Sequence, residues 1–202
     1  MFALVENDSI TKTLNSNKGI TIGENQYPQS IYTLWSPAER EAIGIYEVVY
    51  DDTNKKDQKY YSITDQSLNF AGGVVTASYG SPTARDLNDT NQKDNDGVEL
   101  DPVVVVPGLK TAKKELITEQ ASSLLTPTDW HVVKATEVDS YSVPAEMTTY
   151  RAAVRTASND METKIDACST VDELATLYQY VNTGTVENPV IERPLGEFPE
   201  EI

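Results

Sequence analysis

Apolar and polar residues alternate along much of the first 80 residues, with the period that β-strands show. Asn7-Asp8 divides the first alternating run and predicts a hairpin turn, because both residue types tolerate positive φ. One short helix is predicted where Ser36 can cap, Glu39 can return the capping-box bond and Gly44 can end the helix. We therefore expect a small, mostly antiparallel β module at 1–80, with further strands in 19–28, 45–50, 59–70 and 74–80.

The pattern changes between residues 81 and 108. Asp, Asn, Thr and Gly dominate there without any apolar period, which indicates an acidic linker or a long loop. The run PVVVVPG at its end predicts a short strand bounded by prolines. Because a central strand tolerates proline poorly, this strand should lie at an edge or reach across to a neighbour.

Helical periodicity begins after Gly108 and predicts two long helices, at 109–125 and 144–166. Thr126-Pro127 should end the first helix, and WHVVKATE in the connector is predicted to be extended. Thr170 and Glu173 can form a capping box, which predicts a third helix in STVDELATLYQYV. The expected inner faces are Leu109, Ala112, Leu116, Ile117, Ala121, Leu124 and Leu125, then Met147, Tyr150, Val154, Ala157, Met161 and Ile165, then Leu174, Leu177, Tyr178 and Val181.

Together these patterns predict an α+β fold with four parts. They are a β-rich module at 1–80, an acidic linker with an edge strand at 81–108, a helical hairpin or three-helix domain at 109–183, and an extended proline-rich tail at 184–202. The tail holds three prolines among acidic residues, so alone it should be extended and disordered. If it is ordered, we expect a partner chain to hold it.

The charge and composition of the chain limit the classes of partner that it can bind. The chain has 202 residues, is 39% hydrophobic and carries a formal net charge of -16. Nucleic acids and anionic membranes would be repelled, because nucleic-acid affinity comes mainly from Lys and Arg at phosphates. No apolar run approaches the ~20 residues of a membrane span. The N-terminus lacks the pattern of a signal peptide, so we expect synthesis in the cytoplasm.

No catalytic, metal or cofactor site is predicted. His131 is the single histidine and Cys168 the single cysteine, so a zinc site, a His-based triad and an intrachain disulfide lack partners. His131 is expected to pack or lie at the surface, and Cys168 to be a buried, inert thiol. The run DTNQKDNDGVELD invites a calcium loop, but aligning Gly97 at its sixth position leaves Gln92 and Val103 at the terminal ligand positions. A solvated linker is the preferred interpretation.

The connector between the two long helices needs an anchor, because about eighteen residues is long for a helical hairpin. Trp130 is the predicted anchor, a large ring placed between the helices. Asp129 is expected to cap the preceding turn. Tyr150 should face the same stripe as Val154, with Arg151 and Arg155 one turn apart on the adjacent face. This constellation is predicted to brace the helical pair.

The same stretch resembles a signature of tail fibre assembly proteins and related tail proteins of tailed bacteriophages. In those chains a helix ends in Leu-Leu, a Thr/Ser-Asp-Trp corner follows, and after a loop the next helix opens with an aromatic-Tyr-Arg segment and a second Arg. FALVEND and GIYEVV are similar to the start of many phage tail proteins. Met147 stands where a second tryptophan is usual, and the usual proline-tryptophan ending is absent. The matching residues are Leu124, Leu125, Thr128, Asp129, Trp130, Pro144, Tyr150, Arg151 and Arg155.

The resemblance implies a non-enzymatic structural subunit of a virion tail, at the fibre or baseplate. Such a subunit would bind fibre or baseplate proteins within a larger assembly, through strand edges and the tail. One alternative is an assembly chaperone that helps the fibre to fold or trimerise. A remote alternative is a carboxylate-based hydrolase of host polymers.

Overall fold

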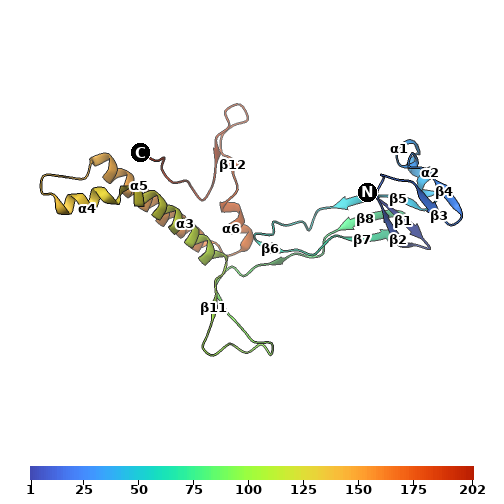
Figure 1. The fold of residues 1–202 in the computed structure, drawn as a ribbon, viewed down its shortest axis with the longest axis horizontal. Coiled ribbons are helices and arrows are strands. Elements are labelled where there is room, and N and C mark those ends of the chain that lie inside the picture. The colour runs from blue at the N-terminus through green and yellow to red at the C-terminus, as the bar shows by residue number, and fades with distance from the viewer. The chain divides into compact units, whose positions relative to one another are not determined.

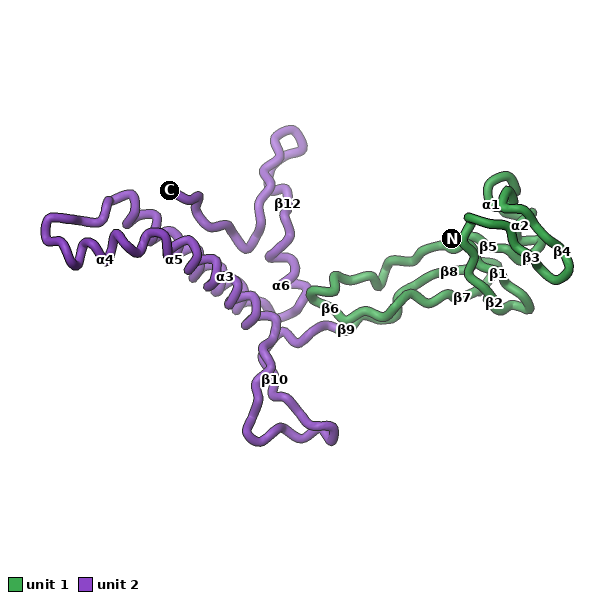
Figure 2. Tube along the Cα trace, in the orientation of Figure 1, with its two compact units in different colours: residues 1–83 green, residues 84–202 purple.

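The computed structural model describes residues 1–202 and has an α+β fold (Figure 1). The chain divides into two compact units, residues 1–83 and 84–202 (Figure 2). Unit 1 contains β1 (Phe2–Glu6), β2 (Ser9–Leu14), β3 (Ile20–Ile22), β4 (Asn25–Tyr27), α1 (Ile31–Leu34), α2 (Pro37–Glu41), β5 (Ile45–Asp51), β6 (Tyr61–Ser62), β7 (Ser67–Ala71) and β8 (Val74–Ser78). The short strand β9 (Thr83–Ala84) spans the division.

Unit 2 contains most of the helical residues of the chain. Its elements are β10 (Thr90–Asn91), β11 (Val105–Val106), α3 (Leu109–Leu125), the 3-10 turn η1 (Thr126–Thr128), α4 (Asp129–Glu137), α5 (Ala145–Ala167), α6 (Val171–Leu177), β12 (Val181–Asn182) and β13 (Ile191–Glu192). None of the helices is long and apolar enough for a membrane span.

Unit 1 is built on a five-stranded sheet with the order β2-β1-β5-β8-β7. All neighbouring pairs are antiparallel except β5 and β8, which run parallel. The expectation of a mostly antiparallel module therefore holds with one exception. The 59–70 run does not form one strand, because only its two ends pair, as β6 and as part of β7.

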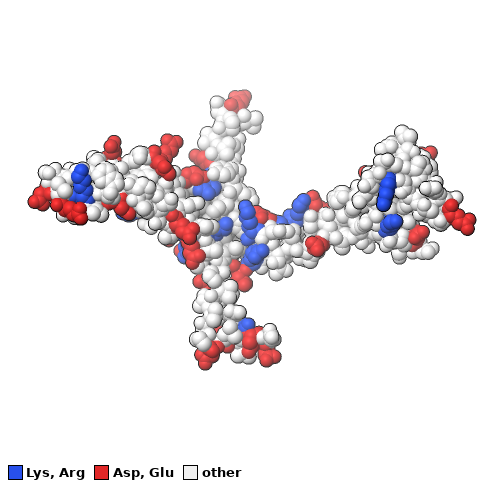
Figure 3. All heavy atoms as spheres, viewed as in Figure 1, with Lys and Arg blue, Asp and Glu red and all other residues white.

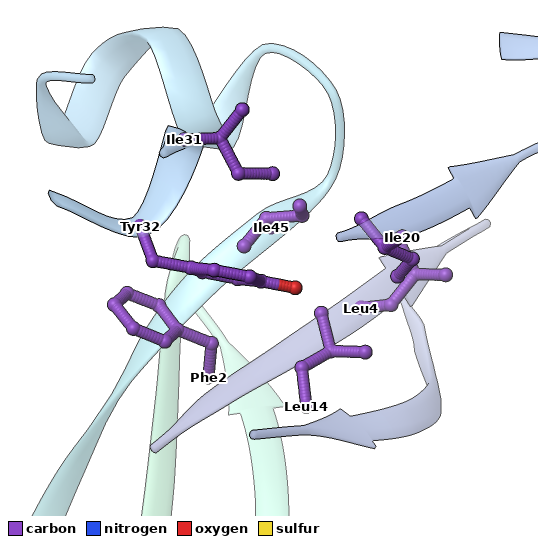
Figure 4. Close-up of a cluster of buried hydrophobic side chains, with 7 residues drawn as sticks. All are labelled: Phe2, Leu4, Leu14, Ile20, Ile31, Tyr32 and Ile45. Carbon is purple, nitrogen blue, oxygen red and sulfur yellow. The ribbon is translucent and has the colours of Figure 1, made fainter. Parts of the chain in front are cut away.

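Both faces of the sheet in unit 1 are covered, so β1 is buried on both sides. Phe2 and Leu4 point into one cluster, which includes Ile31, Tyr32 and Ile45 (Figure 4). The alternate residues of β1 point into the other cluster, whose buried members are Ala3, Val5, Val48, Val75 and Ala77. The period of two in a strand explains why a continuous apolar run, FALV, serves two cores.

The predicted turns and caps of unit 1 are present. Asn7 and Asp8 adopt φ of 52° and 59° at the β1–β2 turn. The Ser36 hydroxyl accepts a bond from the backbone N–H of Glu39, whose carboxylate returns to the Ser36 N–H at 2.8 Å, so the capping box is complete. Gly44 has φ of 80°, and a Cβ there would lie 2.6 Å from the Val5 carbonyl oxygen. Glycine is required at this position for both reasons.

The two long helices of unit 2 form where they were predicted. α3 ends at Leu125, before Pro127, and α5 begins after Pro144. The two helices run antiparallel, and at one end the Lys114 ammonium lies 2.8 Å from the Asp166 carboxylate in a partly exposed ion pair. The inner face of α5 is buried along its length, whereas α3 buries only Ile117 and Ala121 fully. Leu116 is 49% exposed, so the α3 stripe was predicted too wide.

The third helix is also present, with a complete capping box at its N-terminus between Thr170 and Glu173. It stops at Leu177, and Leu174 is fully buried. Val181 was predicted on its inner face, but it lies in β12 and is exposed. The segment expected as a linker contributes a hairpin arm to unit 2, in which β10 pairs with β11.

Candidate interaction surface

Arg151 on α5 ties together the C-terminal end of α3 and the turn that follows it. Its guanidinium is nearly buried and donates to the Leu125 carbonyl at 3.1 Å and to the Thr128 hydroxyl. The Asp129 carboxylate lies 2.8 Å from the same guanidinium. The Leu125 carbonyl is one of the last in α3, and these carbonyls lack partners within the helix. The Arg151 guanidinium supplies a donor to the Leu125 carbonyl, and its positive charge complements the negative end of the helix dipole.

The resemblance pointed to these residues, and the structure brings most of them together. Tyr150 is buried against Ala121 and Val154, with Leu124 and Leu125 beside them. Arg155 lies one turn after Arg151 and donates to its carbonyl oxygen at 3.4 Å. Pro144 precedes the first residue of α5. The cluster braces the helical pair, as predicted, but the centre of the brace is Arg151.

The prediction that Trp130 anchors the connector between the helices is wrong. Residues 129–137 form a helix, α4, so the expected extended connector is also wrong. The Trp130 side chain is 54% exposed, and its ring stacks on His131 with 3.7 Å between centroids. Its other ring neighbour is Tyr141, at 6.4 Å. The buried cluster between α3 and α5 consists of Ala121, Tyr150 and Val154, and Trp130 is not among the residues that pack against it.

The helix α4 and the loop after it present an exposed aromatic and aliphatic surface, which we call the α4 surface. Four large apolar side chains of this segment are at least 39% exposed: Trp130, Val132, Val133 and Val138. A hydrogen bond between His131 Nδ1 and the Tyr141 hydroxyl ties the loop to the helix. The Lys134 ammonium lies 4.4 Å from the Tyr141 ring centroid, over the ring. These contacts hold the rings in place while leaving the indole accessible.

A second exposed apolar surface lies on the β10–β11 arm. Four consecutive residues, Val103 to Val106, are each at least 43% exposed. The Gln92 amide donates to the Val104 carbonyl at 2.8 Å, so residues 92 and 104 form a bonded pair of the ladder. Because bonded and non-bonded pairs alternate, the N–H and C=O of Val105 point to the open edge. The prediction of an edge strand agrees with this geometry.

The end of this arm is acidic (Figure 3). The Asp94 carboxylate accepts bonds from the backbone amides of Asp96 and Val98, both at 2.9 Å, and so closes the turn around Gly97. This turn lies in the run DTNQKDNDGVELD, which was considered above as a calcium-binding loop. No group of three or more His, Cys, Asp or Glu residues in the structure is placed to hold a metal ion.

The C-terminal tail is held by the chain itself, which corrects the expectation that a partner would hold it. Leu195 is 1% exposed, and its amide donates to the Leu177 carbonyl at 3.0 Å. The Lys164 ammonium donates to the carbonyls of Pro194 and Leu195, at 2.8 and 3.0 Å. Phe198 packs against the cluster around Tyr150 and Val154. The periodicity of the sequence could not show these contacts, because single apolar residues between prolines carry no period.

Residues 180–192, which precede the packed part of the tail in the sequence, form a further projecting hairpin of β12 and β13. Tyr180, Val186 and Ile191 are at least 60% exposed there.

Cys168 is buried, and burial and the charge of Glu173 raise the pKa of its thiol. A thiol with a raised pKa is a poor nucleophile at neutral pH.

Comparison of the chain with protein-family models, curated proteins and solved structures returns no match.

Proposed function

We propose that this chain is a non-enzymatic structural subunit of a bacteriophage tail, at the fibre or baseplate, that acts through protein–protein contacts. The exposed apolar projections of unit 2 are the observation that carries the proposal. They are the α4 surface, the valine strand 103–106 and the hairpin 180–192. Contiguous apolar surface left in water is a mark of protein–protein interaction sites.

The link to phage tails rests on the resemblance of residues 109–166. Trp130 belongs to the resembling residues and was predicted to brace the two helices, and the exposed indole removes this support. What remains are the matching residues that meet at Arg151, namely Leu125, Thr128 and Asp129. Trp130 itself becomes a contact residue in the proposal, because tryptophan is enriched among the residues that dominate binding energy at interfaces.

The charge of unit 2 specifies the chemistry of its partner. This unit contains 10 Lys and Arg residues against 22 Asp and Glu, and unit 1 contains 6 against 10. A partner surface rich in Lys or Arg would therefore be attracted to the arms, and a second copy of the same arm repelled. At the β10–β11 arm we propose that an extended strand from such a partner adds to the open edge at Val105.

The arm is suited to strand addition because a two-stranded hairpin is only marginally stable alone in water. A third strand would bond to the free backbone groups of Val105 and cover exposed valine side chains. Replacing Val105 by proline removes the outward N–H without removing a bond to β10, whereas Val105→Thr keeps the backbone and the β-branched shape. We expect V105P to abolish binding at this edge and V105T to leave it.

The alternative is an assembly chaperone for the fibre, which the resemblance also favours. Two measurements separate the functions: mass spectrometry of purified virions of the encoding phage, and co-expression with the adjacent fibre gene. A structural subunit is present in virions in fixed proportion, and the fibre is soluble without it. A chaperone makes the fibre soluble and is missing from virions. A chain that is absent from virions and without effect on the fibre would refute both.

A further inference from the structure

Unit 1 contains a hollow of about 560 Å³ that no part of the proposed function uses. It is bordered by the end of β2, the loop at 15–19, the start of β3 and one residue of α1, Tyr32. The Gln29 side chain amide donates to the Ser16 carbonyl at 3.0 Å and fixes the loop from outside. The volume lies within the range of roughly 300–1,000 Å³ that small-molecule sites occupy.

The hydroxyl of Tyr32 is one of the polar groups that line this hollow. Tyr32 is 7% exposed, and its ring packs on Phe2 with 5.1 Å between centroids. Its hydroxyl points toward Leu4, Leu14 and Ile20 (Figure 4), two of which, Leu14 and Ile20, line the hollow together with Tyr32. It makes no hydrogen bond to the protein. The hydroxyl oxygen is not one of the fully buried side-chain atoms that lack a partner, so it is accessible from the hollow, where it can bond to water or to a ligand.

Burial raises the pKa of the Tyr32 hydroxyl above its ordinary value of 10.0. The group is therefore a neutral phenol at physiological pH, and it can donate a hydrogen bond to an anion.

The charges at the hollow are of one sign, in contrast to the rest of the chain. Lys12 and Lys18 line it, and no Asp or Glu does. No ion pair within the chain neutralises either lysine. Exposed charges more than about 8 Å apart are largely screened at physiological salt, so an anion in the hollow interacts mainly with the charges that line it. Asn15 and Asn17 add amide donors at the rim.

We infer that this hollow is a binding site for a small anionic ligand, one that carries a phosphate or carboxylate group on a carbon skeleton. The ammonium groups of Lys12 and Lys18 pair with the anion, and the Tyr32 hydroxyl donates to one of its oxygens. Leu14 and Ile20 form the apolar side of the hollow and contact the carbon skeleton. The inference is independent of the proposed function in a phage tail.

The test is a titration of the full chain, labelled with nitrogen-15, followed by amide chemical shifts. The probes are inorganic phosphate, glucose 6-phosphate, glucuronate and uncharged glucose, all at one ionic strength. We expect at least one anionic probe to cause saturable shifts confined to residues 12–21 and the surroundings of Tyr32. Glucose should cause none. Comparing glucose 6-phosphate with glucuronate assigns the anionic group as phosphate or carboxylate.

Two variants test the named contacts. Tyr32→Phe removes only the hydroxyl and should weaken binding about tenfold, as expected for a hydrogen bond to a charged group. Tyr46→Phe, a half-buried tyrosine of the same unit outside the hollow, should leave the affinity unchanged. The double variant K12Q/K18Q should abolish binding. Its matched control K55Q/K56Q removes the same charge elsewhere in unit 1 and should retain it.

The lysine pair keeps the test decisive even if Tyr32→Phe disturbs the core, because Lys12 and Lys18 are exposed. Shifts that never saturate, or that spread over the whole unit, would overturn the inference. So would an affinity that is equal in K12Q/K18Q and K55Q/K56Q.

Discussion

Replacing Arg151 by methionine should destabilise unit 2. Methionine keeps much of the apolar length of the side chain but removes the donors to Leu125 O and Thr128 Oγ1. Hydrogen bonds from a charged donor contribute about 1.5–3 kcal/mol each. The Leu125 carbonyl keeps one donor, the Thr128 hydroxyl at 2.6 Å, which limits the loss.

The ion pair with Asp129 adds little, because that carboxylate side chain is 56% exposed and an exposed pair contributes about 0–1 kcal/mol. Together these terms predict that R151M lowers the free energy of unfolding of unit 2 by about 2–4 kcal/mol. Asp129→Asn should cost less than about 1 kcal/mol, because it removes only the exposed pair.

The assay is urea unfolding of the full chain, followed by far-ultraviolet circular dichroism. The long helices lie in unit 2, so the helical signal reports its transition, and two units need not unfold in one step. Arg155→Met is the matched control, since Arg155 is exposed and makes one bond of 3.4 Å to a carbonyl. We expect R155M to cost no more than about 0.5 kcal/mol. Equal midpoints and slopes for R151M and R155M would refute the role assigned to Arg151.

Three further predictions follow from other contacts. Trp130→Ala should change the stability of the chain by less than about 0.5 kcal/mol in urea unfolding but weaken binding to the partner, and a large loss of stability would contradict its place at the surface. Leu195→Ala should cost about 2–4 kcal/mol and make the tail sensitive to limited proteolysis, unlike the exposed Val186→Ala, and a fully protected tail would argue against docking. Hydrogen bonds from the Thr111 hydroxyl and the Gly108 amide hold the pKa of Asp89 below its ordinary value, so this carboxylate stabilises the fold above about pH 3.9 and the contribution is lost as the pH falls through the lower folded-state pKa. Melting temperatures between about pH 2 and 5 should vary less with pH in Asp89→Asn, and an unchanged profile would show that these hydrogen bonds to Asp89 contribute nothing to stability.

The sequence predicted those elements whose signals are local. The Asn7-Asp8 turn, the Ser36 and Thr170 capping boxes and the end of α3 at Leu125 all depend on residues within a few positions of each other. The α+β class followed from the change between strand and helix periods. Such features need no knowledge of tertiary contacts.

The errors arose where distant contacts decide the structure. Val132 and Val133 favour strands, and a run of nine residues is too short for its period to separate α4 from an extended segment. Placing Trp130 between the helices assumed that a large ring must be buried, although rings often remain partly exposed. The docking of Leu195 and the hollow at Tyr32 depend on segments that are separated along the chain, so no local pattern marks them.

Lysine-specific cross-linking of purified virions, followed by mass spectrometry, tests the central claim most directly. Lys134 lies on the α4 surface and Lys93 on the β10–β11 arm, so each reports on one proposed contact. We predict that the chain is present in fixed proportion and that both lysines are linked to basic tail proteins. Virions that lack the chain, or that contain it with cross-links only within itself, would contradict the proposal of a tail subunit that acts through these surfaces.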